Sequence, residues 1–265
     1  MYSIEMKNVS KNFEDFGLKN INLNVPKGSI VGLIGENGSG KTSIIKLILN
    51  LIKKDGGEIK VFGKDNSKED RKIYEKVGSL LDDSYLPNEL NIRKIDNIMS
   101  SLYSNWDFEN FNSLINRFSL PQDKNFKDYS KGMRVKAALA ISLSHNANLL
   151  ILDEPTSGLD PIIRDEILEI FMDYMQSEEN SILISSHISS DLEKIADYIA
   201  FIDNGELIFF EYKDKLIYDY GVLKCKSNEF DKIEKDDLLV YEKTSNGYKC
   251  LLKDKKVLLV NTLSL

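Results

Sequence analysis

Short, uninterrupted apolar runs alternate along this chain with segments whose apolar residues recur every three to four positions. The apolar runs are SIVGLIG at 29–35, EIKVFG at 58–63, VGSLL at 77–81, LLILD at 149–153 and SILISS at 181–186. LLILD and SILISS are continuous and aliphatic, which is typical of strands buried on both faces of a parallel sheet. Because strands alternate with helical segments, the pattern predicts an α/β fold with a largely parallel sheet.

The segment at 161–176 has the most regular helical periodicity. Its shared apolar face is made of Ile163, Ile167, Ile170, Phe171 and Tyr174. Asp160 is a suitable N-cap residue, and Pro161 occupies the first helical position, where proline is tolerated. A second helix is expected at 42–52, directly after the first apolar run.

Two segments interrupt the alternation. Residues 92–127 have helical periodicity and no strong strand, which predicts a helical subdomain inserted at about 88–145. From about residue 221 the pattern changes again. The run DLLVYEKTSNGYKCLLKDKKVLLVN, which begins at Asp237, predicts a strand, a turn at Asn246-Gly247, a second strand, a charged turn and a third strand. We therefore expect a main domain at 1–220 and a small β-rich appendage at 221–265.

Composition narrows the possible partners and compartment. The formal net charge of −7 argues against a nucleic-acid partner bound through a broad basic face. The N-terminus lacks the apolar stretch of a signal peptide, and no apolar run approaches the roughly 20 residues of a membrane span, so a cytosolic chain is expected. Cys225 and Cys250 lack CxxC spacing; buried thiols are the favoured interpretation, and a disulfide is the alternative.

A phosphate-binding loop follows the first apolar run. Gly35, Glu36, Asn37, Gly38, Ser39, Gly40, Lys41 and Thr42 match the pattern GxxxxGK[ST], and Ser43 continues it. Glycines allow successive backbone N–H groups to turn toward an anion, and the helix N-terminus adds positive potential. Lys41 would supply a charge for the β- and γ-phosphates, and the Thr42 hydroxyl could ligate Mg²⁺. The alternative is a tight glycine turn with a surface lysine.

Two carboxylates end the LLILD strand. Asp153 could hold Mg²⁺ opposite Thr42, and Glu154 could orient or deprotonate a water molecule at the γ-phosphate. Buried strands often end in acidic loop residues, so this pattern alone is weak. With the phosphate loop upstream, a nucleotide and Mg²⁺ are the expected ligands.

The combination of motifs resembles the ATP-binding-cassette (ABC) ATPase family. YSKGM at 129–133 stands where that family has its LSGGQ signature, and LLILDEPTSGLDP is similar to its Walker B motif and D-loop. ILISSH places His187 at the family's switch histidine. The resemblance covers about residues 3 to 210. It implies a phosphate-loop core with an N-terminal antiparallel β portion.

The resemblance also implies roles for individual residues. Phe13 would stack on adenine, although a core phenylalanine is the alternative, and His187 would bond the γ-phosphate and position Glu154. Ser130 and Gly132 would reach the γ-phosphate held by a second subunit, and the D-loop, 157–160, would cross that interface with Asp160 near the nucleotide.

Three positions depart from the family pattern. Lys131 and Met133 replace a glycine and a glutamine of the signature, and Lys131 either is simply solvated or adds positive charge near the shared phosphate. The glutamine of the family's Q-loop is absent after VGSLL. Asp82 aligns with it, with Asp83 one position away, and a carboxylate there could contact Mg²⁺ or the attacking water.

The resemblance implies an ATP-hydrolysing subunit that works as a homodimer or heterodimer with a separate ABC-2-type permease, on the inner face of the cell membrane. Within the family, the short cassette resembles Firmicute exporters of peptide antibiotics and phenol-soluble modulins. Alternatives are a soluble ABC ATPase acting on ribosomes or DNA, an importer subunit, and a regulatory nucleotide-binding module. Tyr103 and Trp106 are candidates for a groove that contacts the permease, with core packing as the alternative.

Overall fold

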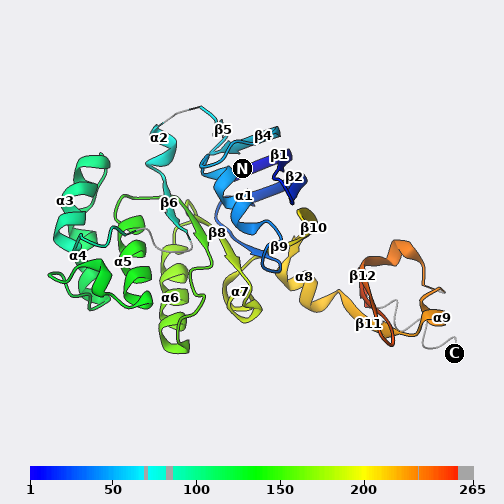
Figure 1. The fold of residues 1–265 in the computed structure, drawn as a ribbon. Helices are drawn as coiled ribbons and strands as arrows, with labels where there is room; N and C mark the ends of the chain where they lie inside the picture. Colours follow the sequence, from blue (N-terminus) through cyan, green and yellow to red (C-terminus); the bar gives the residue numbers. More distant parts are fainter. Residues whose placement is uncertain (69–70, 82–85, 232, 256–265) are drawn as a thin grey trace.

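A six-stranded sheet forms the centre of the fold (Figure 1) in the computed structural model, which describes residues 1–68, 71–81, 86–231 and 233–255. Its strands are β3 (Ile30–Ile34), β6 (Val77–Leu80), β7 (Leu149–Asp153), β8 (Ser181–Ser186), β9 (Tyr198–Asp203) and β10 (Glu206–Tyr212). The order is β10-β9-β3-β8-β7-β6, and every pair is parallel except β9 with β10. The predicted α/β fold with a largely parallel sheet is confirmed.

Helices and a second sheet bury both faces of this sheet. Leu149 and Ile151 of β7 belong to a core shared with the antiparallel sheet and α1, whereas Leu150 and Leu152 belong to a core shared with α5, α6 and α7. The helices are α1 (Lys41–Ile48), α5 (Lys131–Leu143), α6 (Pro161–Tyr174) and α7 (Ser189–Ile195). Because neighbouring residues of β7 face opposite cores, the strand is aliphatic throughout.

The N-terminal antiparallel sheet has the order β2-β1-β4-β5. Its strands are β1 (Tyr2–Asn12), β2 (Gly17–Pro26), β4 (Gly56–Val61) and β5 (Lys64–Asp65), and the short helix α2 (Arg71–Tyr74) follows. The turn that joins β1 to β2 contains two phenylalanines, Phe13 and Phe16. This turn becomes one wall of the site described below.

The helical insert has its own apolar core. It contains α3 (Ile92–Leu102), α4 (Phe108–Arg117) and the 3₁₀ helix η1 (Phe126–Asp128), which pack on α5. The Trp106 indole N–H donates to Asp96 at 2.8 Å, and the ring packs against Phe111. Tyr103 stacks on the buried ring of His145 with centroids 4.2 Å apart. These contacts favour core packing for Tyr103 and Trp106 over a role in a groove.

The chain leaves the central sheet through α8 (Lys213–Tyr218) and enters a small three-stranded sheet, which Figure 1 shows beside the main body. Its elements are β11 (Gly221–Cys225), α9 (Ser227–Phe230), the 3₁₀ helix η2 (Lys235–Asp237), β12 (Leu238–Thr244) and β13 (Gly247–Leu252). The hairpin turn is Ser245-Asn246 and Gly247 already begins β13, so the expected turn was one residue late.

The small sheet differs from the expected one in its third strand. The third described strand is β11, which pairs with β13, and the expected strand VLLVN lies outside the described residues. Cys225 and Cys250 are free thiols, and Cys250 is buried beside Leu238 and Leu252. In the described part of the chain, no helix combines the length and the hydropathy that a membrane span requires.

Candidate active site

Three of the predicted motifs meet at one edge of the central sheet. β3, β8 and β7 are parallel neighbours, so their carboxyl ends lie side by side. The phosphate loop follows β3, Glu154 follows β7 and His187 follows β8. Ligands of open α/β sheets bind at this edge, beyond the carboxyl ends of the strands.

The phosphate loop folds around the Lys41 side chain. Gly38 and Gly40 have φ angles of 84° and 113°, in a region that side chains with a Cβ rarely occupy. Lys41 is 6% exposed, and its ammonium donates to the carbonyl oxygens of Gly35 at 2.7 Å and Glu36 at 3.0 Å. The buried Ser39 hydroxyl has no hydrogen-bond partner, so a polar group of the loop remains unsatisfied.

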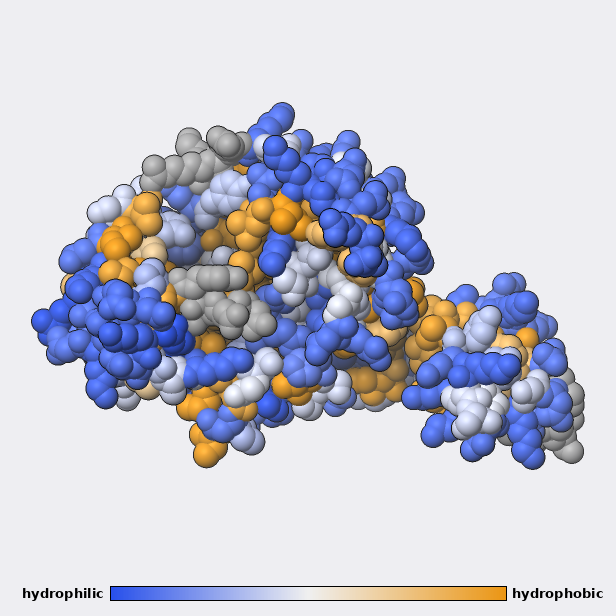
Figure 2. Space-filling view, viewed as in Figure 1, coloured by the Kyte–Doolittle hydropathy of each residue, from blue (hydrophilic) through white to orange (hydrophobic). Residues whose placement is uncertain are grey.

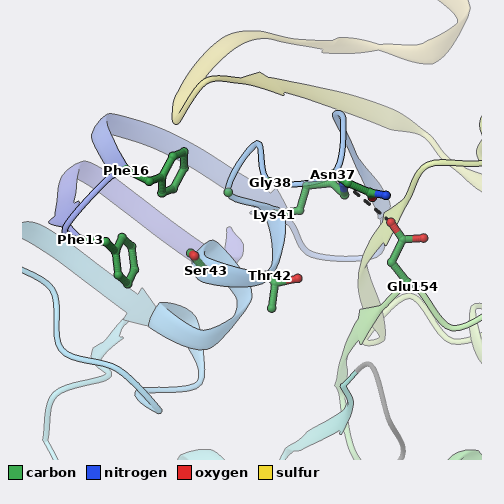
Figure 3. Close-up of a pocket in the computed structure, with 9 residues that line it drawn as sticks. Phe13, Phe16, Asn37, Gly38, Lys41, Thr42, Ser43 and Glu154 are labelled. Atoms are coloured by element: carbon green, nitrogen blue, oxygen red, sulfur yellow. Dashed lines mark ion pairs between the residues drawn. The ribbon is translucent and has the colours of Figure 1, made fainter.

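An open cavity of about 470 Å³ lies against this loop (Figure 3). Its lining residues are Phe13, Phe16, Asn37, Gly38, Gly40, Lys41, Thr42, Ser43 and Glu154. This volume suits a small organic ligand. Aromatic rings line one end, and charged and hydroxyl groups line the other, as an aromatic base joined to phosphates would require.

Phe13 and Phe16 form the aromatic wall. Their ring centroids are 6.0 Å apart, and the Phe13 N–H donates to the Phe16 carbonyl at 2.7 Å, which closes the turn. Phe13 is 41% exposed, which contradicts the alternative of a core phenylalanine. Sequence reasoning missed Phe16. The available signal was the turn NFEDFG between two strands, because such a turn brings its two aromatic residues together.

Thr42 and Asp153 bring two side-chain oxygens, both suitable as metal ligands, together at the base of the loop. The Thr42 hydroxyl donates to Asp153 Oδ2 at 2.8 Å, and Ser185 donates to Oδ1 at 2.6 Å. Asp153 is 1% exposed. A hydroxyl beside a carboxylate fits Mg²⁺, which prefers oxygen ligands and takes only one or two carboxylates from a protein. Ser185 was not predicted; its signal was a serine at the end of a buried strand beside β7.

Glu154 lies between Lys41 and His187. Its Oε2 accepts from His187 Nδ1 at 2.6 Å, and its Oε1 is 3.8 Å from the Lys41 ammonium, the ion pair dashed in Figure 3. An ionised carboxylate can only accept, so His187 Nδ1 carries the hydrogen in this contact. Oε1 is buried without a hydrogen-bond partner, which leaves it free to accept a proton or a hydrogen bond.

The signature residues line a second cavity of about 260 Å³. Ser130, Lys131, Gly132, Gly158 and Asp160 are among its lining residues, and none of its lining residues belongs to the first cavity. The Ser130 hydroxyl caps α5 by accepting from the Met133 N–H at 3.3 Å. Within one chain, therefore, the signature is separate from the phosphate loop. Asp82 and Asp83 lie outside the described residues.

Comparison with known proteins identifies the family. The family model described as ABC transporter matches residues 18–157. The chain belongs to the ABC transporter family. The bacitracin transport ATP-binding protein BcrA of Enterococcus faecalis is 35% identical over 210 residues, which cover 78% of this chain and 68% of that protein. The lantibiotic transport ATP-binding protein SrtF of Streptococcus pyogenes is 38% identical over 193 residues, covering 72% and 82%.

Solved structures agree with this assignment. An ATP-binding subunit of an ABC transporter superposes with a TM-score of 0.73 at 25% identity, covering 80% of this chain and 91% of that one. A dimeric ATP-binding cassette in a post-hydrolysis state, bound to ADP and Pi, has the same fold at 21% identity, with a TM-score of 0.70 and coverage of 79% and 98%. This protein is therefore an ATP-binding subunit and an ATPase, as the sequence predicted.

Proposed function

We propose that this ATP-binding subunit holds ATP with its adenine against Phe13 and Phe16 and its phosphates in the loop at 35–43, and that Glu154 is the general base. The observation that carries the proposal is the free, buried Oε1 of Glu154, 3.8 Å from the Lys41 ammonium. A base must lie close to the phosphate that it serves, and Glu154 lines the same cavity as the loop.

Each residue has a distinct part in the reaction. His187 holds Oε2, so Glu154 presents Oε1 to a water molecule and takes a proton from it. The water oxygen bonds to the γ-phosphorus as the bond to the ADP oxygen breaks. Lys41 and the loop N–H groups stabilise the phosphate charge. Thr42 and Asp153 would hold Mg²⁺, which neutralises phosphate charge when bound.

We further propose that the active form is a dimer. Ser130 and Gly132 lie at the N-terminus of α5, where backbone N–H groups favour an anion. Since their cavity is separate from the phosphate loop, a second copy or a related subunit would bring the phosphate to them. Asp160 lines the same cavity and would face that subunit, and Asp82 remains the predicted Q-loop residue.

The partner and substrate follow from the relatives. BcrA and SrtF carry the names bacitracin transport and lantibiotic transport, so we propose that this chain drives export of peptide antibiotics or similar amphipathic compounds. It would do so with a separate ABC-2-type permease, at the inner face of the cell membrane. We place the ATPase domain at 1–220 and the appendage at 221–265.

The test uses Glu154→Gln, which keeps the shape of the side chain and removes the base. Turnover is expected to fall by about 10²–10⁴, because a general base contributes a factor of this size. The solution mass of the variant is measured with Mg-ATP and without nucleotide. A doubling only with Mg-ATP supports the shared site, whereas a monomer in both states despite tight ATP binding contradicts a homodimer. Undiminished turnover would contradict the role of Glu154.

A further inference from the structure

The buried carboxylate of Asp191 has no part in the proposed reaction. Asp191, the third residue of α7, is 2% exposed. Its Oδ2 accepts a 2.7 Å hydrogen bond from the hydroxyl of Thr156, which is itself 1% exposed. Burying a carboxylate is costly unless it is paired or well bonded, so this placement requires a structural or functional reason.

The contact joins two loops that are already joined at the active site. Glu154 and Thr156 belong to the loop after β7, and His187 and Asp191 to the segment after β8. Glu154, which lines the cavity, contacts His187, and the buried Thr156 contacts the buried Asp191. With two hydrogen-bonded contacts between them, the loops cannot move independently.

Arg164 of α6 extends this cluster to the D-loop, residues 157–160. It donates to the Leu159 carbonyl at 3.3 Å, while its Nε lies 3.9 Å from Asp191 Oδ2. That distance is too long for a hydrogen bond, and the Nε is buried without any hydrogen-bond partner. A shift of less than about 1 Å would bring this donor within hydrogen-bond distance. The cluster therefore has an unformed contact that a small movement can complete.

We propose that Thr156, Asp191 and Arg164 form a buried tether that makes the position of the D-loop depend on the contact between Glu154 and His187. Asp191 is thus a positioning residue: it touches no substrate and acts through Thr156 and Arg164. The proposal rests on the proposed function, in which Glu154, held by His187, acts beside bound ATP and Asp160 of the D-loop faces the second subunit. Occupancy of one ATP site then changes the surface offered to the partner.

The test compares Thr156→Val and Asp191→Asn in the Glu154→Gln background. Each substitution preserves side-chain shape and weakens the tether. We expect ATP-driven dimerisation to weaken about tenfold, a typical coupling between sites, while ATP affinity of the single subunit stays within about twofold. Thr156→Ser, which keeps the hydroxyl, should restore dimerisation. A merely structural role would lower the melting temperature without separating these two affinities.

A matched control exists on the same two helices. Asp165 of α6 and Lys194 of α7 form a 2.6 Å ion pair, with side chains that are 60% and 57% exposed. Asp165→Asn should change neither dimerisation nor ATP affinity, because exposed pairs contribute little. If Thr156→Val does not fold, Arg164→Met, at a partly exposed side chain, removes the same tether and should weaken dimerisation similarly.

A second readout does not depend on dimerisation. The Ser157 and Leu159 N–H groups donate to the Glu154 and Thr156 carbonyls at 3.1 and 3.3 Å. In dilute single subunits, ATP should slow hydrogen exchange of these amides, and Thr156→Val should abolish the slowing. Unchanged ATP protection and dimerisation in both tether variants would overturn the inference. Failure of Glu154→Gln alone to dimerise would contradict the proposed dimer, and the exchange measurement would still decide the tether.

Discussion

The backbone of Glu154 illustrates how single residues are positioned here. Its φ angle is 48°, in the left-handed region that non-glycine residues occupy infrequently, and its N–H donates to Ser185 Oγ at 2.9 Å. Such a conformation costs about 1–3 kcal/mol and persists only when surrounding contacts hold it. Ser185 also donates to the Asp153 carboxylate, so one hydroxyl from β8 holds the side chain of Asp153 and the backbone of Glu154.

Lys131 gives a prediction at the same scale. Its side chain lines the second cavity beside Gly158, and no ion pair joins it to any residue in the described ranges. If it faces the shared phosphate, Lys131→Met should weaken ATP-driven dimerisation of the Glu154→Gln protein about three- to tenfold at low salt. The difference should shrink at high salt, because partly exposed charges are screened. Sedimentation at two ionic strengths measures both.

Lys127→Met provides the comparison for Lys131. Lys127 is half-exposed and lies 3.7 Å from Glu89, outside the second cavity. The Lys127→Met substitution should leave dimerisation unchanged at either salt concentration. Equal effects of the two substitutions, or none from Lys131→Met, would assign Lys131 to simple solvation.

At the scale of elements, the start of α5 combines a helix cap with the proposed phosphate contact. The Ser130 hydroxyl caps the helix, and Gly132 lets α5 approach α6: a Cβ there would lie 3.2 Å from Ile163 Cγ2. The free N–H groups of a helix N-terminus attract an anion. The same turn of helix therefore supports packing against α6 and the proposed phosphate contact.

Ser130→Ala separates these two contributions. Losing the cap should lower the free energy of unfolding by about 1 kcal/mol. A hydrogen bond to a charged phosphate contributes about 1.5–3 kcal/mol, so its loss should also lower turnover about 10- to 100-fold. Asp107→Ala is the control, since Asp107 caps α4 by accepting from Asn110 at 2.9 Å. It should lose similar stability and retain turnover, as urea titration and ATPase assays would show; parallel losses in both variants would reduce Ser130 to a cap.

The β11-β13-β12 sheet gives a prediction about pH. Burial, followed by the neighbouring Cys225 thiol, raises the pKa of Cys250 from 9.0 to about 11. At pH 8 the native thiol should react with iodoacetamide about 100-fold more slowly than an unfolded one, because only the thiolate reacts. The folded state keeps the thiol proton up to a higher pH than the unfolded state does. The contribution of this proton to stability is therefore complete below pH 9 and is lost as the pH rises toward 11. Rapid labelling of native Cys250, followed by mass spectrometry, would contradict this.

At the scale of the whole molecule, the described appendage packs mainly on itself. Leu238, Cys250 and Leu252 form its small core, while the space-filling view shows apolar surface where it meets the main body (Figure 2). α8 links the two parts and leaves Ile217 and Tyr218 more than half exposed. The proposed catalytic groups, Glu154 and His187, lie in the main body, at the carboxyl edge of the central sheet.

Removal of residues 221–265 tests the proposed domain boundary. The 1–220 chain should fold and hydrolyse ATP within about twofold of the full chain, since none of the appendage lines the nucleotide cavity. A chain that ends after Asp203 is the comparison. It lacks β10, whose Leu207 and Phe210 pack against the core, and should not fold cooperatively. Loss of activity in the 1–220 chain would show that the appendage belongs to the ATPase domain.

The sequence alone determined the features that local spacing controls. The phosphate loop, the carboxylates after LLILD, and the N-caps Asp160 and Ser130 all depend on residues within one turn or strand end. The parallel strands β3, β6, β7 and β8 were predictable because buried parallel strands are aliphatic on both faces. EIKVFG was predicted as a strand, but its place as β4 in the antiparallel sheet was not. Family resemblance supplied His187 and Phe13, whose roles no local pattern specifies.

Only the tertiary structure decided which distant residues meet. Sheet order brings β8 beside β7, so Ser185 reaches Asp153, and Asp191 reaches Thr156. The pairing of β11 with β13 could not be predicted from the sequence either, because the path of the chain, and not the periodicity of a strand, decides which strands become neighbours. Side-chain contacts between segments 30 or more residues apart depend on packing of the whole domain. Local sequence patterns therefore located the chemistry, and the fold selected the residues that position it.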